Sequence, residues 1–304
     1  MFEEKRPDIR IGFLKFAELR PPECVLAGAA GTHTVCVCMI HENFKLKFLS
    51  AKLDQIEKFT SYRDMLKFNI CNPPLESCFL GKCNNSSCGD LEPLRHMICL
   101  HVDKNCMDEI PSKQWTNQER CSLQTIVSDT DTFIDAFIDM IPTVRAHDFI
   151  ASKQAEFYKH TRENLKEGEV LAIVDFSENY SFVYQDSVQG VHYNNAQATI
   201  HPFAAYHLQE GKIVPLNYVV ISDNMDHSTA TFYTFLSKFI IFLKSKIPLL
   251  NKIVYFSDGA GAQYKNRYNM INLLYHRKDF SLKAEWHFLQ LPMAKGQVMA
   301  WVAL

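Results

Sequence analysis

The chain has 304 residues, 47% of them hydrophobic and 22% charged, which is enough to bury one large core or two smaller ones. The formal net charge is −2 and the pI about 6.6, so the composition excludes a strongly basic protein, and any DNA contact must come from a local patch. No signal peptide precedes residue 20 and no apolar run approaches the roughly 20 residues that span a bilayer, which predicts an intracellular protein outside the membrane.

All ten cysteines lie between Cys24 and Cys121, which predicts a cysteine-rich, partly helical N-terminal module. Because nothing marks the chain as secreted, these cysteines favour metal binding over disulfides. Two groups have spacings compatible with zinc ligands, with Cys24, His33 and Cys71 as supporting candidates: Cys36, Cys38 and His41; and Cys78, Cys83 and Cys88. On a strand, Cys36 and Cys38 would share a face. The alternative is that these two are small buried hydrophobes and the rest are surface thiols.

A helical connector is expected next, over residues 130–141 and 143–166, as two helices broken at Pro142 and ended by Gly168. One side of this connector is basic and predicts either contact with a DNA backbone or a solvated helix face. Its residues are Arg145, His147, Lys153, Lys159, His160 and Arg162.

Two apolar segments, residues 170–175 and 252–258, each end in an aspartate, Asp175 and Asp258, 83 residues apart. Burying a carboxylate is costly unless it is paired, hydrogen-bonded or bound to a metal. The pattern therefore predicts two buried strands whose aspartates face one magnesium site.

The residues between and after these two strands form a pattern of strands and helices that predicts the fold. A meander should end with strands over residues 196–206 and 213–221, followed by a helix over 229–247, the Asp258 strand, a helix over 264–276 and a strand over 282–288. The order β-β-β-α-β-α-β is that of an α/β, RNase H-like mixed sheet, in which the first and fourth strands lie side by side. Their aspartates then meet at the carboxyl edge of the sheet.

Six motifs within these elements resemble one family: DFSENY (175–180), QDSVQG (185–190), QATIHP (197–202), FSDG (256–259), QYKN (263–266) and AEWHF (284–288). Together they are similar to transposon-derived proteins with a DDE/D transposase core, and the likeness runs from about Lys15 to Phe288. The resemblance implies that Asp175 and Asp258 are the first two ligands of a Mg²⁺ or Mn²⁺ pair that cleaves phosphodiesters. It also implies DNA as the partner and a nuclear location, and it allows a homo-oligomer.

The third acid that the resemblance implies is absent after Phe288. The family continues there with a glycine-rich segment that carries an aspartate, whereas residues 289–304 differ. Restoring one nucleotide after the Phe288 codon, with suitable synonymous codons, returns that segment in the neighbouring frame. We therefore expect residues 289–304 to be a frameshift product and the chain to begin after a DNA-reading domain.

The residues after Asp258 offer a phosphate-binding segment, because glycines admit a backbone amide and cations neutralise a phosphate. Gly259, Lys265 and Arg267 are its candidates, against the plainer reading of a helix entry with solvated charges. Trp286 and Phe288 are expected in the core, with His287 on the opposite face.

The sequence thus predicts a cysteine-rich module at 1–125, a connector at 126–168 and an incomplete transposase-like core at 169–304. We expect an ancestral DNA-cleaving site that is inactive in this form. Two alternatives stay open: a DNA- or protein-binding module without catalysis, and a divergent nuclease in which another acid, such as Glu178, replaces the missing one.

Overall fold

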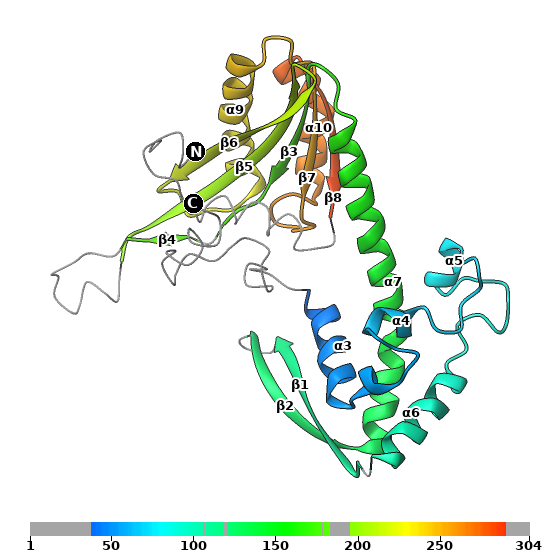
Figure 1. Ribbon diagram of the computed structural model, residues 1–304. Helices are drawn as coiled ribbons and strands as arrows, with labels where there is room; N and C mark the ends of the chain where they lie inside the picture. Colours follow the sequence, from blue (N-terminus) through cyan, green and yellow to red (C-terminus); the bar gives the residue numbers. More distant parts are fainter. Residues whose placement is uncertain (1–37, 106, 118–120, 178, 183–194, 290–304) are drawn as a thin grey trace, which may run out of the picture. The chain divides into compact units, whose positions relative to one another are not determined.

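The computed structural model describes residues 38–105, 107–117, 121–177, 179–182 and 195–289 (Figure 1). The chain divides into two units, residues 1–35 and 36–304, and the description below concerns the second. This unit is mixed α/β, with a six-stranded mixed sheet preceded by a cysteine-rich helical region, as the sequence predicted at this level. None of the helices in the described part of the chain is both long and apolar enough to cross a bilayer.

The N-terminal region consists of short helices followed by an antiparallel hairpin. Its elements are α3 (Met39–Ser50), η1 (Leu53–Gln55), α4 (Tyr62–Leu66), α5 (Glu76–Phe79), α6 (Glu92–Lys104), β1 (Glu109–Asn117) and β2 (Cys121–Asp129). Ser61 and Asp64 form a capping box that begins α4, with the Ser61 backbone N–H donating to Asp64 Oδ2 over 2.8 Å. A core of buried apolar side chains from α3, α6 and the following helix holds these pieces together, and Phe44 stacks on Phe137 at 4.7 Å between ring centroids.

The connector is one helix, α7 (Thr130–Glu163), and the expected break at Pro142 is wrong. A proline inside a helix removes a backbone hydrogen bond and costs about 3 kcal/mol. Pro142 is exposed, whereas its neighbours Ile141 and Val144 are buried in the N-terminal core. We attribute the continuous helix to this packing, because tertiary contacts supply most of a helix's stability in proteins.

The sheet has the predicted strands in the predicted order, with one two-residue strand added. Its strands are β3 (Glu169–Val174), β4 (Tyr180–Ser181), β5 (Gln197–Gln209), β6 (Lys212–Ser222), β7 (Lys252–Ser257) and β8 (Lys283–Phe288). The longest path across the sheet is β6, β5, β3, β7, β8, and β4 pairs with the first two residues of β5. β3 is antiparallel to β5 and parallel to β7, so the two aspartate-ending strands are neighbours in the middle.

Helices cover both faces of this sheet (Figure 1). α9 (Thr229–Lys246) buries the predicted stripe of Phe232, Phe235, Leu236, Phe239, Ile240 and Leu243. On the other face, Tyr158 near the end of α7 packs on Phe256 at 5.3 Å between ring centroids. α10 (Arg267–Phe280) connects β7 to β8 and begins at Asn266, whose side chain accepts from the Asn269 N–H.

Alternation along β8 sends its aromatic side chains to opposite faces. Trp286 stacks on Tyr255 and Phe288 packs in the same cluster, whereas the His287 ring lies 4.8 Å from Phe157 of α7. The prediction for these three side chains is therefore confirmed.

Candidate metal centres

Four cysteines meet in the N-terminal region. The sulfurs of Cys71, Cys78, Cys83 and Cys88 all lie within 4.8 Å of one another, and those of Cys71 and Cys83 are 3.8 Å apart. Ligand sulfurs about 2.3 Å from a tetrahedral zinc would be separated by about 3.8 Å, whereas a disulfide requires about 2 Å. All four are free thiols in a geometry that could hold a metal such as zinc. The predicted Cys78, Cys83 and Cys88 come together, and Cys71, a supporting candidate, completes the set.

The electrostatics of the four thiols suit a cation. The Leu75 N–H, 3.5 Å from the Cys78 sulfur, lowers the pKa of that thiol to about 7. At Cys88 the Cys71 N–H lowers the pKa, but desolvation and the three neighbouring thiols raise it further, to about 12. The four thiols therefore oppose one another's ionisation, and a divalent cation would favour their thiolate forms.

The four-cysteine cluster packs on α7. Phe79 at the end of α5 stacks on Phe149 of α7 at 4.8 Å, with only 10° between the ring planes. Gly89, directly after Cys88, has a φ of +81°, and a side chain there would come within 3.1 Å of Arg145. Both features tie the cysteine loop to one turn of the long helix.

Arg145 is buried and does not belong to a basic DNA-facing side, so that part of the sequence interpretation is wrong. Its guanidinium donates to the carbonyl of Leu66 over 2.7 Å and to that of Phe68 over 3.2 Å, and burial lowers its pKa. Lys153, Lys159 and His160 are exposed, as expected for either reading of that side. Arg162 is half-buried and lies over the ring of Tyr206.

Cys38 lies at the start of a helix, so the strand placement considered for Cys36 and Cys38 is wrong for Cys38. Cys38 is the N-cap residue of α3, and His41 follows in its first turn. Cys36, Cys24 and His33 lie outside the described residues. A potential co-ligand of Cys38 comes from far along the chain: His147 Nε2 is 3.1 Å from the Cys38 sulfur. No local spacing could have indicated this partner.

Asp175 and Asp258 follow directly on the two central strands. The β3–β7 register pairs Ile173 with Phe256, and continuing it by two residues sets Asp175 opposite Asp258. Asp175 is 3% exposed and Asp258 is half-buried. Tyr264 is fully buried, and its pKa is raised well above the ordinary value by desolvation and then by the charges of Asp175 and Asp258. The charges of both carboxylates therefore act on one phenol.

Buried polar groups support this edge of the sheet. The Tyr264 hydroxyl lies 3.0 Å from His201 Nε2, and desolvation lowers the pKa of that imidazole to about 3. Asp258 Oδ1 accepts from the Ala260 N–H over 3.0 Å, which fixes the turn that follows β7. Trp286 Nε1 donates to Ser257 Oγ over 2.9 Å. His201, Tyr264 and Ser257, which form these hydrogen bonds, are all fully buried.

The predicted phosphate-binding residues are all exposed: Gly259 and Lys265 lie between β7 and α10, and Arg267 is the first residue of α10. The Lys265 ammonium lies over the Phe288 ring, and Arg267 donates to the Tyr268 hydroxyl over 2.8 Å. Glu178, named as a replacement acid, lies outside the described residues, as do residues 290–304. Within the described chain, only the two cysteine-containing groups bring three or more potential ligand atoms within 4.8 Å of one another.

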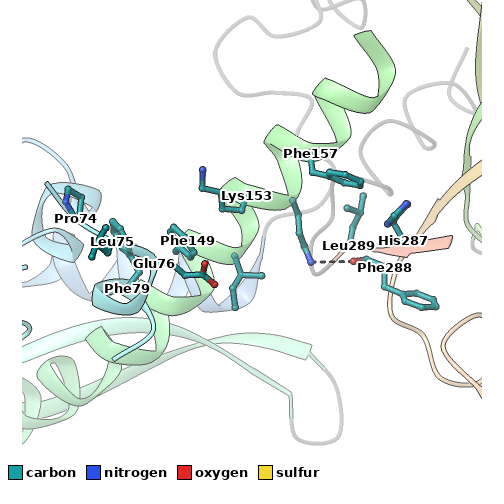
Figure 2. Close-up of a pocket in the computed structure, with 12 residues that line it drawn as sticks. Pro74, Leu75, Glu76, Phe79, Phe149, Lys153, Phe157, His287, Phe288 and Leu289 are labelled. Atoms are coloured by element: carbon teal, nitrogen blue, oxygen red, sulfur yellow. Dashed lines mark hydrogen bonds between the residues drawn. The ribbon is translucent and has the colours of Figure 1, made fainter. Parts of the chain in front are cut away.

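A groove of about 740 Å³ lies between α5, α7 and the end of β8 (Figure 2). Phe79, Phe149 and Phe157 line it (Figure 2). Gln154 also belongs to the lining and donates to the Phe288 carbonyl over 3.2 Å. Glu76 and Lys153 are its acidic and basic lining residues. A mainly apolar lining of this kind does not resemble a surface that follows a phosphate backbone.

Comparison with known proteins gives two matches without an assigned activity. No curated protein and no solved structure matches the chain. Residues 39–145, which contain the four-cysteine cluster, match a family described as a domain of unknown function (DUF8700). Residues 154–300, which contain Asp175 and Asp258, match a second domain of unknown function (DUF8701). The chain is therefore similar to two such families, and the first matched region ends, and the second begins, within α7.

Proposed function

We propose that the β3–β8 sheet is an RNase H-like core of the DDE/D transposase type, whose ancestral activity is two-metal cleavage and transfer of DNA strands. The observation that carries the proposal is the β3–β7 register, which sets Asp175 opposite Asp258 at the carboxyl edge of two parallel central strands. Open α/β sheets bind their ligands at this edge. The antiparallel trio β6, β5 and β3, extended by parallel β7 and β8, supports the same fold.

The chemistry of the pair fits hard divalent cations. Carboxylate oxygens suit Mg²⁺ and Mn²⁺, and two such ions about 3.5–4 Å apart would activate water and stabilise the leaving oxygen of a phosphodiester. Two ions carry four positive charges, whereas Asp175 and Asp258 supply two negative ones. We therefore expect the described residues to hold one ion weakly and a second hardly at all, and strand cleavage to stay at background.

Metal titration tests the assignment of the site. The paramagnetic relaxation of water protons measures Mn²⁺ binding. The parent protein should show one weak site, and both Asp175→Asn and Asp258→Asn should lack it, because each substitution removes a ligand charge. Asp223→Asn, at an exposed acid after β6, is the matched control and should bind as the parent does. Equal binding by all four proteins would mean that the site is placed wrongly.

Cleavage tests the ancestral activity. Replacing residues 289–304 with the family's glycine-rich, aspartate-bearing segment should add the third ligand and recover metal-dependent nicking of a DNA duplex. Asp258→Asn in that background should abolish it. Nicking that survives this substitution would contradict the proposal.

A non-catalytic DNA-binding module is the second candidate, and the exposed cations Lys265 and Arg267, which follow Asp258 in the chain, favour it. Such binding should be independent of sequence and should weaken steeply with salt, because phosphate contacts release counterions. Lys265→Gln and Arg267→Gln should each lower the slope of log affinity against log salt by about 1, whereas Lys159→Gln on α7 should leave it unchanged. Fluorescence anisotropy with a labelled duplex measures these slopes.

A further inference from the structure

We propose that Cys38, His41 and His147 form a second zinc centre, separate from the four-cysteine cluster. One potential ligand atom from each of the three lies within 4.8 Å of the others, and the Cys38 sulfur is 3.1 Å from His147 Nε2. The two imidazole rings are 4.8 Å apart between centroids. One thiolate and two imidazoles are a ligand set that zinc accepts, with a fourth position completed by water or another group.

The fold brings these side chains together from distant parts of the chain. Cys38 and His41 are presented by the first turn of α3, whereas His147 belongs to the middle of α7, 109 residues after Cys38. The stack of Phe44 on Phe137 fixes α3 against α7. The three ligands therefore lie on two helices that are already packed, which is a favourable arrangement for a metal site.

A carboxylate stands behind one of the ligands. Asp148 Oδ1 lies 3.2 Å from His41 Nε2 and 3.2 Å from Arg63 Nε. In protein zinc sites, the ring nitrogen that does not bind the metal usually donates to a carboxylate, which orients the imidazole and increases its basicity. Asp148 Oδ1 is thus within ion-pair distance of His41 Nε2, a buried atom that makes no hydrogen bond among the described residues.

A cysteine–histidine nucleophile pair is the competing reading of the short Cys38–His147 contact. Such a pair needs one imidazole, oriented by a third group. Here a second imidazole converges on the same position, and the carboxylate of Asp148 lies beside that second ring. A metal explains both histidines, whereas a nucleophile pair leaves His41 without a role.

Zinc stoichiometry of the full chain, purified under reducing conditions, tests the proposal. Elemental analysis should find two zinc ions per chain. Cys38→Ser and His147→Gln should each leave one, Cys83→Ser should also leave one, and Cys38→Ser combined with Cys83→Ser should leave none. His160→Gln, an exposed histidine on the same helix, is the matched control and should keep both. One zinc per chain that depends on Cys83 alone would overturn the second centre.

X-ray absorption at the zinc edge keeps the test independent of variant folding. The parent protein should show a mixed sulfur and nitrogen shell with the outer scattering of coordinated imidazole. A shell of sulfur alone would overturn the proposal whatever the variants do.

Discussion

The surroundings of single polar residues change the interpretation of the basic side predicted for the connector. Arg145 and His147 looked like members of one basic surface, but a helix turns by about 100° per residue and so directs neighbouring side chains to different surroundings. Arg145 bonds to two backbone carbonyls near α4, and His147 points at Cys38. The sequence could name the residue types for metal binding, but their partners depended on packing that no local spacing encodes.

Arg145 should be important for stability. Arg145→Met keeps much of the volume but leaves the Leu66 and Phe68 carbonyls without their donor, so we expect a loss of about 2–4 kcal/mol of unfolding free energy. Lys153→Met is the control, because Lys153 makes an exposed ion pair with Glu156 worth less than about 1 kcal/mol. Urea unfolding measures both, and equal effects would contradict the assigned role.

His201 should make the sheet sensitive to acid. Its pKa is about 3 when folded and 6.5 otherwise, so the unfolded chain binds more protons and stability falls as pH drops from 6.5 towards 3. Between pH 6.5 and pH 5 this one group should cost about 2 kcal/mol. His201→Gln retains an acceptor for Tyr264 and should flatten that dependence in urea unfolding at several pH values. His160→Gln is the control and should keep the parent's pH dependence of the unfolding free energy. The same pH dependence in His201→Gln as in the parent would exclude His201 as its source.

Elements differ in how far their sequence foretold them. The apolar stripe of α9 has the spacing of a helix with one buried face, and the continuous apolar runs of β3 and β7 are typical of strands buried on both faces. The sequence predicted these three elements closely. The continuity of α7 was not predicted. The expectation that proline breaks a helix considers only the local backbone, whereas the buried residues near Pro142 are held by contacts with distant parts of the fold. The sequence predicted a metal-binding role for Cys78, Cys83 and Cys88. Only the turns around α5 show that Cys71 joins these three cysteines.

Pro142 gives a direct test of this competition. Pro142→Ala restores a donor to the Ile138 carbonyl and removes the ring clash, so the unfolding free energy should rise by about 1–3 kcal/mol. Thr143→Ala, at the adjacent exposed position, is the control and should change it by less than about 1 kcal/mol. Thermal and urea unfolding report the difference. A destabilised Pro142→Ala would mean that the core requires the proline's backbone geometry.

At the scale of the whole molecule, the N-terminal region contains both candidate metal centres, whereas the sheet is held by its own apolar clusters. A strong chelator should therefore speed amide hydrogen exchange in residues 69–90 and at the start of α3, while β3 and β7 keep their protection. Hydrogen exchange read by mass spectrometry resolves these segments. Protection that collapses equally in the sheet would show that the two regions unfold as one cooperative unit.

The parallel pairing of β3 with β7 also affects the order of folding. The β5–β6 hairpin closes over the two residues Glu210 and Gly211, whereas Asp175 and Asp258 meet only after an 83-residue loop has been drawn together. Loop closure over so long a segment is slow compared with hairpin formation. The edge that carries the two aspartates should consequently be among the last parts to assemble on the growing chain. A ribosome that stops before Asp258 would release a hairpin and a helix without the pairing of β3 with β7.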